Sequence, residues 1–170
     1  RWFKPDYARF GIDGLTPDII SLLKKRAYDI CAVTDQSEKK IKFNYNGAPI
    51  PVKNFQQYID MYIGPKEGAD ANKRIYESAD GRWEYAVALT PTNEFLQVSF
   101  VNGIYTSKGG KHVEYILNQI TRKLTEFIEK KKKVKVNPNS IKEQLILFLR
   151  CDIENPSFDS QTKDFMNTPM

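Results

Sequence analysis

Residues 100–131, FVNGIYTSKGGKHVEYILNQITRKLTEFIEKK, carry the signal that decides the fold, because a strand pattern gives way to a helix pattern within them. Apolar residues then step by three or four, which predicts one long helix over about 112–131 with an apolar stripe against a core. The stripe consists of Val113, Ile116, Leu117, Ile120, Leu124, Phe127 and Ile128. The helix ends in a run of lysines, so its last turn is predicted to be polar.

Strands are predicted on both sides of this helix. The segments 76–89 and 95–101 are rich in aromatic and aliphatic residues, and Pro91-Thr92-Asn93 marks a turn between them. After the helix, residues 140–153 are rich in Leu, Ile and Phe, which predicts a final strand or a helix–strand unit.

The N-terminal part of the chain has two helix signals. Residues 1–10, RWFKPDYARF, look like an exposed strand interrupted at Pro5. Thr16 is a good N-cap, Pro17 suits the first helical position, and apolar residues recur at helical spacing over 17–32. The basic residues 24–26 fall on the wetter side of that helix.

Residues 41–62 predict a hairpin and a short helix. Asn46-Gly47 is a strong turn signal between an alternating strand over 41–45 and a returning strand over 50–52. Phe55 to Tyr62 has a helical apolar side. The polar, glycine-bearing stretch 64–73 that follows is the best candidate for a domain boundary.

Composition excludes several classes of protein. With 170 residues, 41% hydrophobic and 28% charged, the chain is ordinary soluble globular material without an apolar run long enough to cross a bilayer. It opens with Arg1 and has no signal peptide, so we expect a piece of a longer protein. Cys31 and Cys151 match no metal spacing and are expected to be buried thiols in a reducing compartment. His112, the single histidine, cannot build a metal site alone and is expected to be structural.

Positive charge is concentrated in one region. The net charge is +5, but residues 108–150 hold eleven Lys and Arg against four Asp and Glu, a net +7 that leaves −2 for the rest. This asymmetry points to one basic face and an anionic partner such as nucleic acid. Lys130, Lys131, Lys132 and Lys133 exceed what capping of a helix dipole needs, and they suit sequence-independent contact with a phosphate backbone.

Two loops are candidate sites. Residues 107–111, SKGGK, fail the spacing of a phosphate-binding loop, so a strand-to-helix turn that needs glycine is favoured over an anion site at the helix start. Residues 153–165, IENPSFDSQTKDF, form a polar loop that leads to the lone cation Lys163. From composition alone this loop is either a simple turn or a functional segment.

Several stretches together resemble a known family in colinear order. The two most specific are FVNGIYTSKGGKHV (100–113) and IENPSFDSQTK (153–163), and the others are FKPDYARFG (3–11), LKKRAYDI (23–30), YNGAPIPVKNFQQYIDMYI (45–63) and GRWEYAVAL (81–89). They closely resemble the ATPase region of eukaryotic-type type IIA DNA topoisomerases, over nearly the whole chain.

The resemblance implies an α+β fold in two modules. Residues 1–62 would be the C-terminal part of a nucleotide-binding module of the Hsp90 and gyrase type. Residues 63–170 would be most of a transducer, which resembles the second domain of ribosomal protein S5 and has a left-handed βαβ crossover. The composition boundary near Gly64 falls at that junction.

The resemblance also implies roles for named residues. Gln161, Thr162 and Lys163 would contact ATP, with Lys163 on the γ-phosphate and Gln161 assisting, so that the loop senses the nucleotide and couples its state to closure of a DNA clamp. Lys130 to Lys133 would face double-stranded DNA. The parent enzyme would use ATP and Mg²⁺, with the metal ligands outside these residues, and would be a homodimer. The chain alone is expected to be inactive and monomeric.

The location implied is the nucleus in a eukaryotic cell, or host cytoplasm or nucleus if the source is viral. Two alternatives from other classes remain open. One is a non-enzymatic basic DNA-binding module, and the other is a structural interaction domain with solubilising lysines.

Overall fold

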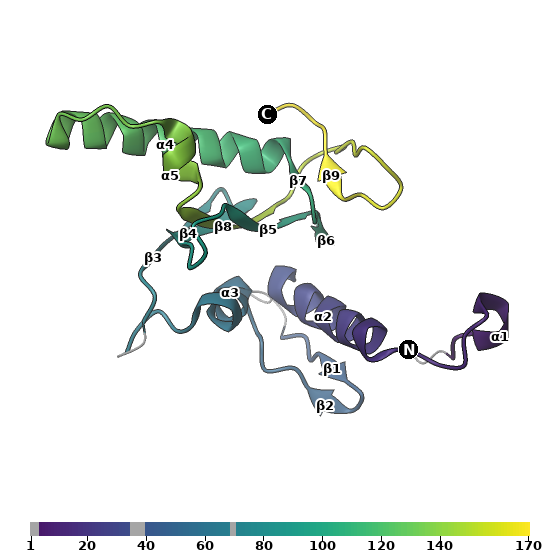
Figure 1. The fold of residues 1–170 in the computed structure, drawn as a ribbon. Coiled ribbons are helices and arrows are strands. Elements are labelled where there is room, and N and C mark those ends of the chain that lie inside the picture. The colour runs from purple at the N-terminus through teal and green to yellow at the C-terminus, as the bar shows by residue number, and fades with distance from the viewer. Residues whose placement is uncertain (1–3, 35–39, 69–70) are drawn as a thin grey trace.

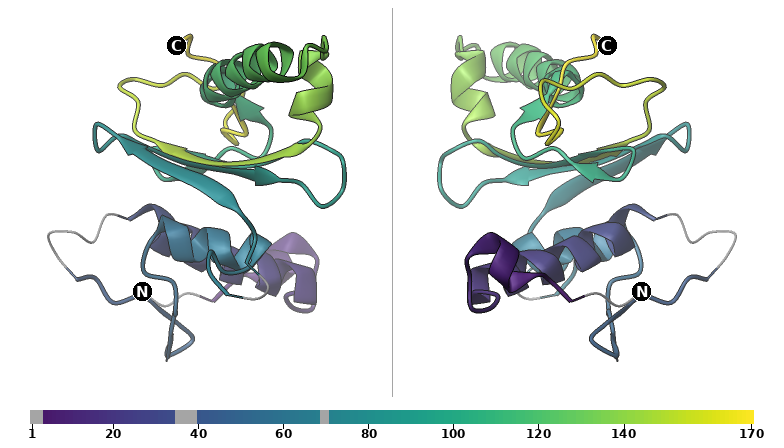
Figure 2. Two further views of the ribbon diagram at one scale, coloured as in Figure 1. Left: turned by 90° about the vertical axis from the view of Figure 1, so that its left-hand side faces the viewer. Right: turned by 90° about the vertical axis from the view of Figure 1, so that its right-hand side faces the viewer.

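The computed structural model describes residues 4–34, 40–68 and 71–170, and these form three layers (Figure 1, Figure 2). A mixed β-sheet lies in the middle. Helices α4 (Lys111–Lys132) and α5 (Pro138–Lys142) cover one face, and α2 (Pro17–Val33) and α3 (Phe55–Ile63) cover the other. The α+β fold class is therefore confirmed.

The described part of the central sheet has five strands in the order β3-β4-β8-β5-β6. Their bounds are β3 (Arg74–Ala79), β4 (Trp83–Leu89), β5 (Leu96–Val101), β6 (Ile104–Tyr105) and β8 (Leu145–Cys151). Strand β8 pairs antiparallel with β4 and parallel with β5. The chain crosses from β5 to β8 through α4, as a parallel pair requires.

Strand β8 is the centre of the molecule because both of its faces are covered. Leu145, Leu147 and Leu149 pack with the α4 side, whereas Ile146 and Phe148 pack with the α2–α3 side. All five are at most 5% exposed. A strand that is covered on both sides has a continuous apolar sequence, and residues 145–149 read LILFL.

The long helix and the helix–strand unit are confirmed. Helix α4 spans Lys111–Lys132, and α5 precedes β8 in the segment where a helix–strand unit is predicted. The prediction is wrong for one member of the apolar stripe, because the side chain of Phe127 is 57% exposed. It lies about 100° around the helix from Ile128, at the edge of the stripe, and its ring lies under the Lys131 ammonium.

The N-terminal elements differ from the prediction at one point. Residues 4–10 hold no strand; instead α1 (Tyr7–Phe10) forms because Asp6 accepts a hydrogen bond from the Arg9 amide and Gly11 ends the turn in the left-handed conformation. The predicted strand at 1–10 is therefore wrong where the chain is described, and residues 1–3 lie outside the described ranges.

Helix α2 is confirmed, and its start follows the sequence signals. The Ile19 amide donates to Thr16 Oγ1 at 3.3 Å, and Pro17 is the first helical residue. Its apolar positions are nevertheless largely open: Cys31 and Ala32 are buried, but five others are exposed. Those five are Ile19, Ile20, Leu22, Leu23 and Ile30.

The hairpin is confirmed at its turn but is shorter than predicted. Strands β1 (Asn44–Tyr45) and β2 (Ala48–Pro49) flank Asn46-Gly47. The predicted strand over 50–52 is wrong, although the Ile50 amide still donates to the Phe43 carbonyl at 2.9 Å. Helix α3 confirms the helical segment at 55–62.

The proposed boundary region lies between α3 and β3. The described residues of 64–73 hold no helix or strand. Contacts nevertheless cross it, since Arg74 Nη1 lies 2.7 Å from Asp60 Oδ1 and Arg150 Nη1 donates to the Val33 carbonyl at 3.1 Å. The division after residue 62 stays a prediction.

Both cysteines are buried free thiols, as expected. Burial raises the pKa of the Cys151 thiol to about 12, so it behaves as an inert core residue. Among the described helices, none combines the length and apolarity needed to span a membrane.

Candidate functional site

The polar segment at 159–165 is a tight loop, called here the 159–165 loop. The Asp159 amide donates to the Phe165 carbonyl at 3.1 Å and closes it. Within it, the Lys163 amide donates to the Ser160 carbonyl at 3.1 Å. Lys163 itself has φ +60, a left-handed conformation that is uncommon for a residue with a side chain. Gln161 and Thr162 are exposed at the tip.

The side chains of Gln161 and Lys163 have no polar partner among the described residues. Within the described ranges, neither has an ion pair or a side-chain hydrogen bond. The Lys163 ammonium lies 5.6 Å from the centre of the Phe158 ring, a weak cation–π contact at a half-exposed position. An ammonium and an amide are therefore free to bind an anion that approaches the tip.

The base of the loop is held by Asp164. Its Oδ2 accepts from Thr162 Oγ1 at 2.9 Å, and its Oδ1 accepts from Ser107 Oγ at 3.1 Å. The Lys108 ammonium lies 3.7 Å from Oδ2. The Thr162 hydroxyl first, and then Ser107 and Lys108, lower the pKa of the Asp164 carboxyl below its ordinary value.

After the loop, the chain pairs with the start of α4. Strand β9 (Phe165–Met166) runs parallel to β7 (Gly109–Gly110). A β-carbon added at Gly110 would come within 2.6 Å of the Met166 nitrogen, and Gly110 has φ +143. The two glycines of SKGGK therefore allow this close approach, which supports the strand-to-helix turn over a phosphate-binding loop.

The other groups of SKGGK are engaged as well. Lys111 Nζ lies 2.8 Å from Glu114 Oε2, and Lys108 pairs with Asp164.

His112 is fully buried, with Nε2 3.1 Å from Thr106 Oγ1. Burial lowers the pKa of His112 to about 4, so it is a neutral core residue at physiological pH, as expected from the sequence.

The lysine cluster, Lys130 to Lys133, lies at the opposite end of α4 from the loop (Figure 1). Three of its lysines form the last turn, and Lys133 is the C-cap with φ +56. All four are exposed, and none has an ion pair within the described residues. They neutralise the negative helix end and remain free for an anionic partner. The distance between cluster and loop rules out a single site.

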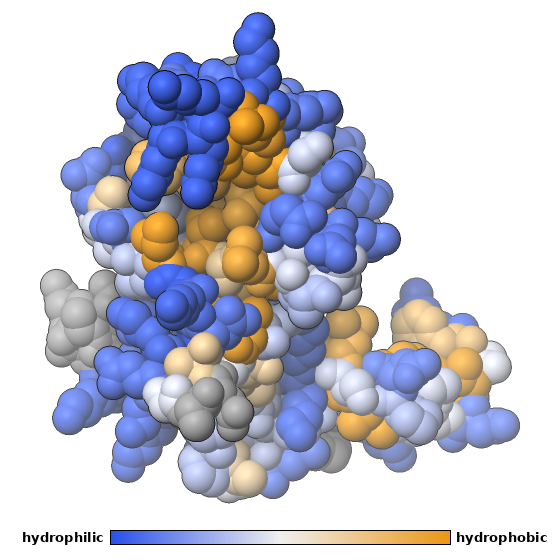
Figure 3. All heavy atoms as spheres, turned by 60° about the vertical axis from the view of Figure 1, so that its left-hand side comes forward, coloured by the Kyte–Doolittle hydropathy of each residue, from blue (hydrophilic) through white to orange (hydrophobic). Residues whose placement is uncertain are grey.

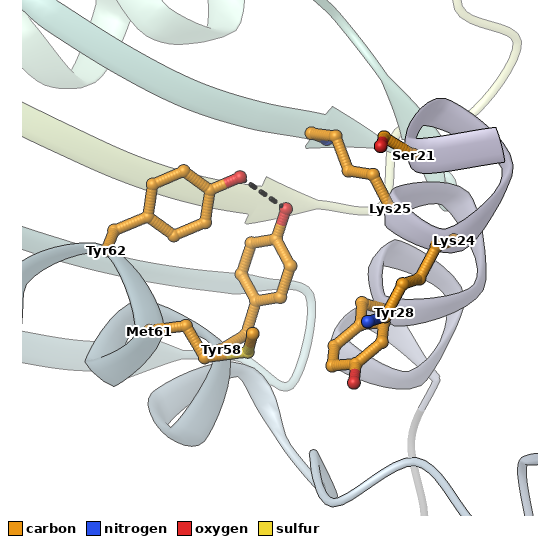
Figure 4. Close-up of a pocket in the computed structure, with 7 residues that line it drawn as sticks. All are labelled: Ser21, Lys24, Lys25, Tyr28, Tyr58, Met61 and Tyr62. Atoms are coloured by element: carbon orange, nitrogen blue, oxygen red, sulfur yellow. Dashed lines mark hydrogen bonds between the residues drawn. The ribbon is translucent and has the colours of Figure 1, made fainter. Parts of the chain in front are cut away.

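A hollow that the sequence analysis did not predict lies between α2 and α3 (Figure 4). Tyr58 and Tyr62 of α3 face Lys24, Lys25 and Tyr28 of α2 across a space of about 340 Å³. Ser21 and Met61 complete its lining.

A buried carboxylate lies behind this hollow. Asp29 is 3% exposed, accepts from the Tyr58 hydroxyl at 2.6 Å and pairs with Lys25 at 2.9 Å. Burial, the Asp29 bond and the Tyr62 bond raise the pKa of Tyr58 above its ordinary value. An acidic residue in the apolar repeat of α2 is the signal that could have found this network.

An apolar hollow of about 480 Å³ lies between α4 and the edge of the sheet (Figure 3). Its apolar lining comes from both layers and consists of Ile75, Tyr85, Val87, Ala88, Leu89, Ile120, Leu124 and Leu145.

Comparisons with known proteins give one consistent result. A family model described as DNA gyrase B matches residues 54–170. DNA topoisomerase 2-beta of Mus musculus is 42% identical over 168 residues, and DNA topoisomerase 2-alpha of Gallus gallus is 44% identical, each match covering 96% of this chain. The chain spans about a tenth of the length of these relatives.

Solved structures agree with the sequences. The ATPase region of Saccharomyces cerevisiae topoisomerase II superposes with a TM-score of 0.83 at 37% identity, over 98% of this chain and 40% of that one. The ATPase and transducer domains of DNA topoisomerase II from Balamuthia mandrillaris give 0.83 at 32% identity, over 97% of this chain and 40% of that one.

Proposed function

Because this chain belongs to the type II DNA topoisomerase family, in its eukaryotic-type branch, we propose that it is part of an ATP-driven enzyme that passes one DNA duplex through a transient double-strand break. In this proposal the chain contributes the ATP-sensing loop and a DNA-contacting surface. The alternative of a purely structural domain has no support from the comparisons.

The observation that carries the proposal is the state of Lys163. It sits on a loop that is tied at its base, yet its ammonium has no ion partner within the described residues. An ammonium is a compact charge that stabilises the negative charge of a phosphoryl group during transfer. Lys163 therefore contacts the γ-phosphate, and the Gln161 amide donates a further hydrogen bond.

The described residues of this chain are suited to bind phosphate and not a metal ion. Within the described residues, no group of three His, Cys, Asp or Glu side chains lies close enough to hold a metal ion. The donors at the loop tip, an ammonium and an amide, fit phosphate oxygens rather than Mg²⁺. Mg²⁺ would accompany ATP and neutralise phosphate charge, while Lys163 and Gln161 of this chain would hold the terminal phosphate.

The same contact would transmit the state of the nucleotide. A loop that binds the γ-phosphate only while it is present changes its position on hydrolysis. The chain would thereby close a clamp on the transported duplex when ATP binds and release it afterwards. Dimerisation of the full protein supplies the second half of such a clamp. The eukaryotic relatives favour a nuclear location, with host cytoplasm or nucleus if the source is viral.

The test is ATP turnover by the full-length protein with Lys163→Ala. We expect a loss of about 10²-fold or more, the usual cost of removing one preorganised donor from a developing charge. Lys123→Ala removes an equal charge from an exposed position of α4 and should leave turnover unchanged. Unchanged turnover in Lys163→Ala would mean that the loop is only a turn, and the non-enzymatic DNA-binding alternative would then be favoured.

The lysine cluster is proposed to contact the DNA backbone. Replacing Lys130, Lys131, Lys132 and Lys133 by alanine should weaken DNA binding and flatten its salt dependence, since each phosphate contact contributes to the slope. A slope that is unchanged in the fourfold variant would leave these lysines with a capping and solubilising role.

A further inference from the structure

Asp164 joins the 159–165 loop to residues 107–108, which lead through β7 into α4, by both its side chain and its main chain. Its carboxylate accepts from Thr162 inside the loop and from Ser107 on the other segment. Its carbonyl accepts from the Lys108 amide at 3.0 Å. A single side chain therefore connects two segments that lie 57 residues apart.

The residue beside Asp164 needs such an anchor. Lys163 has φ +60, a conformation that costs of order 1 kcal/mol and persists only where the surroundings over-determine it. The peptide on its N-terminal side is fixed by the bond from the Lys163 amide to the Ser160 carbonyl. The peptide on its C-terminal side ends at the Cα of Asp164, whose side chain and carbonyl are both hydrogen-bonded, so these contacts restrain where that peptide ends.

The segment that Asp164 contacts, residues 107–110, is itself held in place by the packing around it. Strand β7 pairs with β9, Met166 is fully buried, and Gly110 lies against the Met166 backbone. The segment then enters α4, whose inner side packs on β8 over its N-terminal turns. Residues 107–110 therefore move together with α4, and Asp164 is hydrogen-bonded to them.

We infer that Asp164 is the positioning residue of Lys163, because it locks the 159–165 loop to the segment 107–110 that leads into α4 and so holds the lysine where it reaches the γ-phosphate. This inference rests on the proposed function for the role of Lys163. It makes the loop and α4 one body, with the lysine cluster at the far end of a helix that is roughly 30 Å long.

The experiment compares three variants of the full-length protein. Asp164→Ala removes the acceptor of Ser107 and Thr162, and Asp164→Asn keeps one oxygen. Asp159→Ala is the matched control, because Asp159 is an exposed carboxylate of the same loop whose side chain accepts only from Ser160 among the described residues.

Backbone hydrogen exchange of residues 159–165 is measured first, without nucleotide. In Asp164→Ala we expect exchange of the Asp159 and Lys163 amides, which donate within the loop, to rise about tenfold, the effect of losing one or two hydrogen bonds. Asp164→Asn should give a smaller rise and Asp159→Ala none. Unchanged exchange in Asp164→Ala would overturn the inference, whatever happens to turnover.

ATP turnover is measured on the same proteins. We expect kcat to fall at least about tenfold in Asp164→Ala, with partial recovery in Asp164→Asn and little change in KM, because the Lys163 contact matters most in the transition state. A residue that only supported the fold would reduce the active fraction instead, which titration of active sites detects.

Two outcomes separate this inference from the proposed function. If Lys163→Ala abolishes turnover while Asp164→Ala loosens the loop without lowering kcat, the positioning role is wrong and the phosphate contact stands. If Lys163→Ala keeps full turnover, the proposed function is wrong, and the role assigned to Asp164 in reaching the γ-phosphate falls with it.

Discussion

The pH response of His112 can be worked out from its surroundings. Nε2 lies 3.1 Å from the Thr106 hydroxyl, which can donate its own proton to the Ser99 carbonyl at 3.0 Å and also lies 2.5 Å from Ser99 Oγ. We assign the ring proton of the neutral imidazole to Nε2, where the Thr106 hydroxyl can accept it, because a proton on Nδ1 would have no acceptor. Nδ1 is buried without a hydrogen-bond partner within the described residues. A second proton would have no acceptor there, so protonation is disfavoured.

The size of the effect follows from linkage. Burial lowers the pKa of His112 from 6.5 to about 4 in the native state, while the unfolded chain keeps the ordinary value. Well above pH 6.5 both states are neutral, and the stability is fully present. As the pH falls the unfolded state binds the proton first, so the free energy of unfolding drops by about 2 kcal/mol at pH 5 and about 3 kcal/mol at pH 4.

The assay is an NMR titration of the imidazole in this 170-residue chain. It has one histidine, so its ring resonance is assigned without ambiguity. We expect a midpoint near 4 while the chain remains folded, and a slope of unfolding free energy between pH 6.5 and 4 that is smaller in a His112→Gln chain. A midpoint at or above 6 in the folded chain would refute the argument from burial and tautomer.

Three further perturbations test the packing. Gly110→Ala should lower the free energy of unfolding in urea by more than about 2 kcal/mol, because the added β-carbon would meet the Met166 backbone and alanine disfavours a φ of +143. Gly14→Ala is the control: its β-carbon would enter open space, and the free energy of unfolding should change by less than about 0.5 kcal/mol. Leu147→Ala, at 1% exposed, should cost about 2–5 kcal/mol, and Ile75→Ala, at 66% exposed, much less. Asp29→Asn should lower the thermal midpoint through a loss of about 1–3 kcal/mol, and an unchanged midpoint would show that its buried bonds contribute nothing net.

Local rules explain why several elements could be predicted. The helix at 17–32 begins at a threonine cap followed by proline, and the long helix follows from one apolar stripe, so both depend on residues at most four positions apart. The error at 1–10 has the same origin. Its aromatic residues favour a strand, but the Asp6 cap and Gly11 close a helical turn at 7–10.

Short-range patterns and matching motifs were enough to predict the helices near 17–32, 55–62 and 112–131, the Asn46-Gly47 turn, the family, and Lys163 as a candidate binding cation. The packing of the folded chain was needed to show that β8 lies between β4 and β5, that Asp29 is buried against Tyr58, and that Asp164 meets Ser107. These contacts join residues 29 to 68 positions apart. No local preference specifies them, because they form only when burial of the central strand on both faces offsets the entropy of closing long loops.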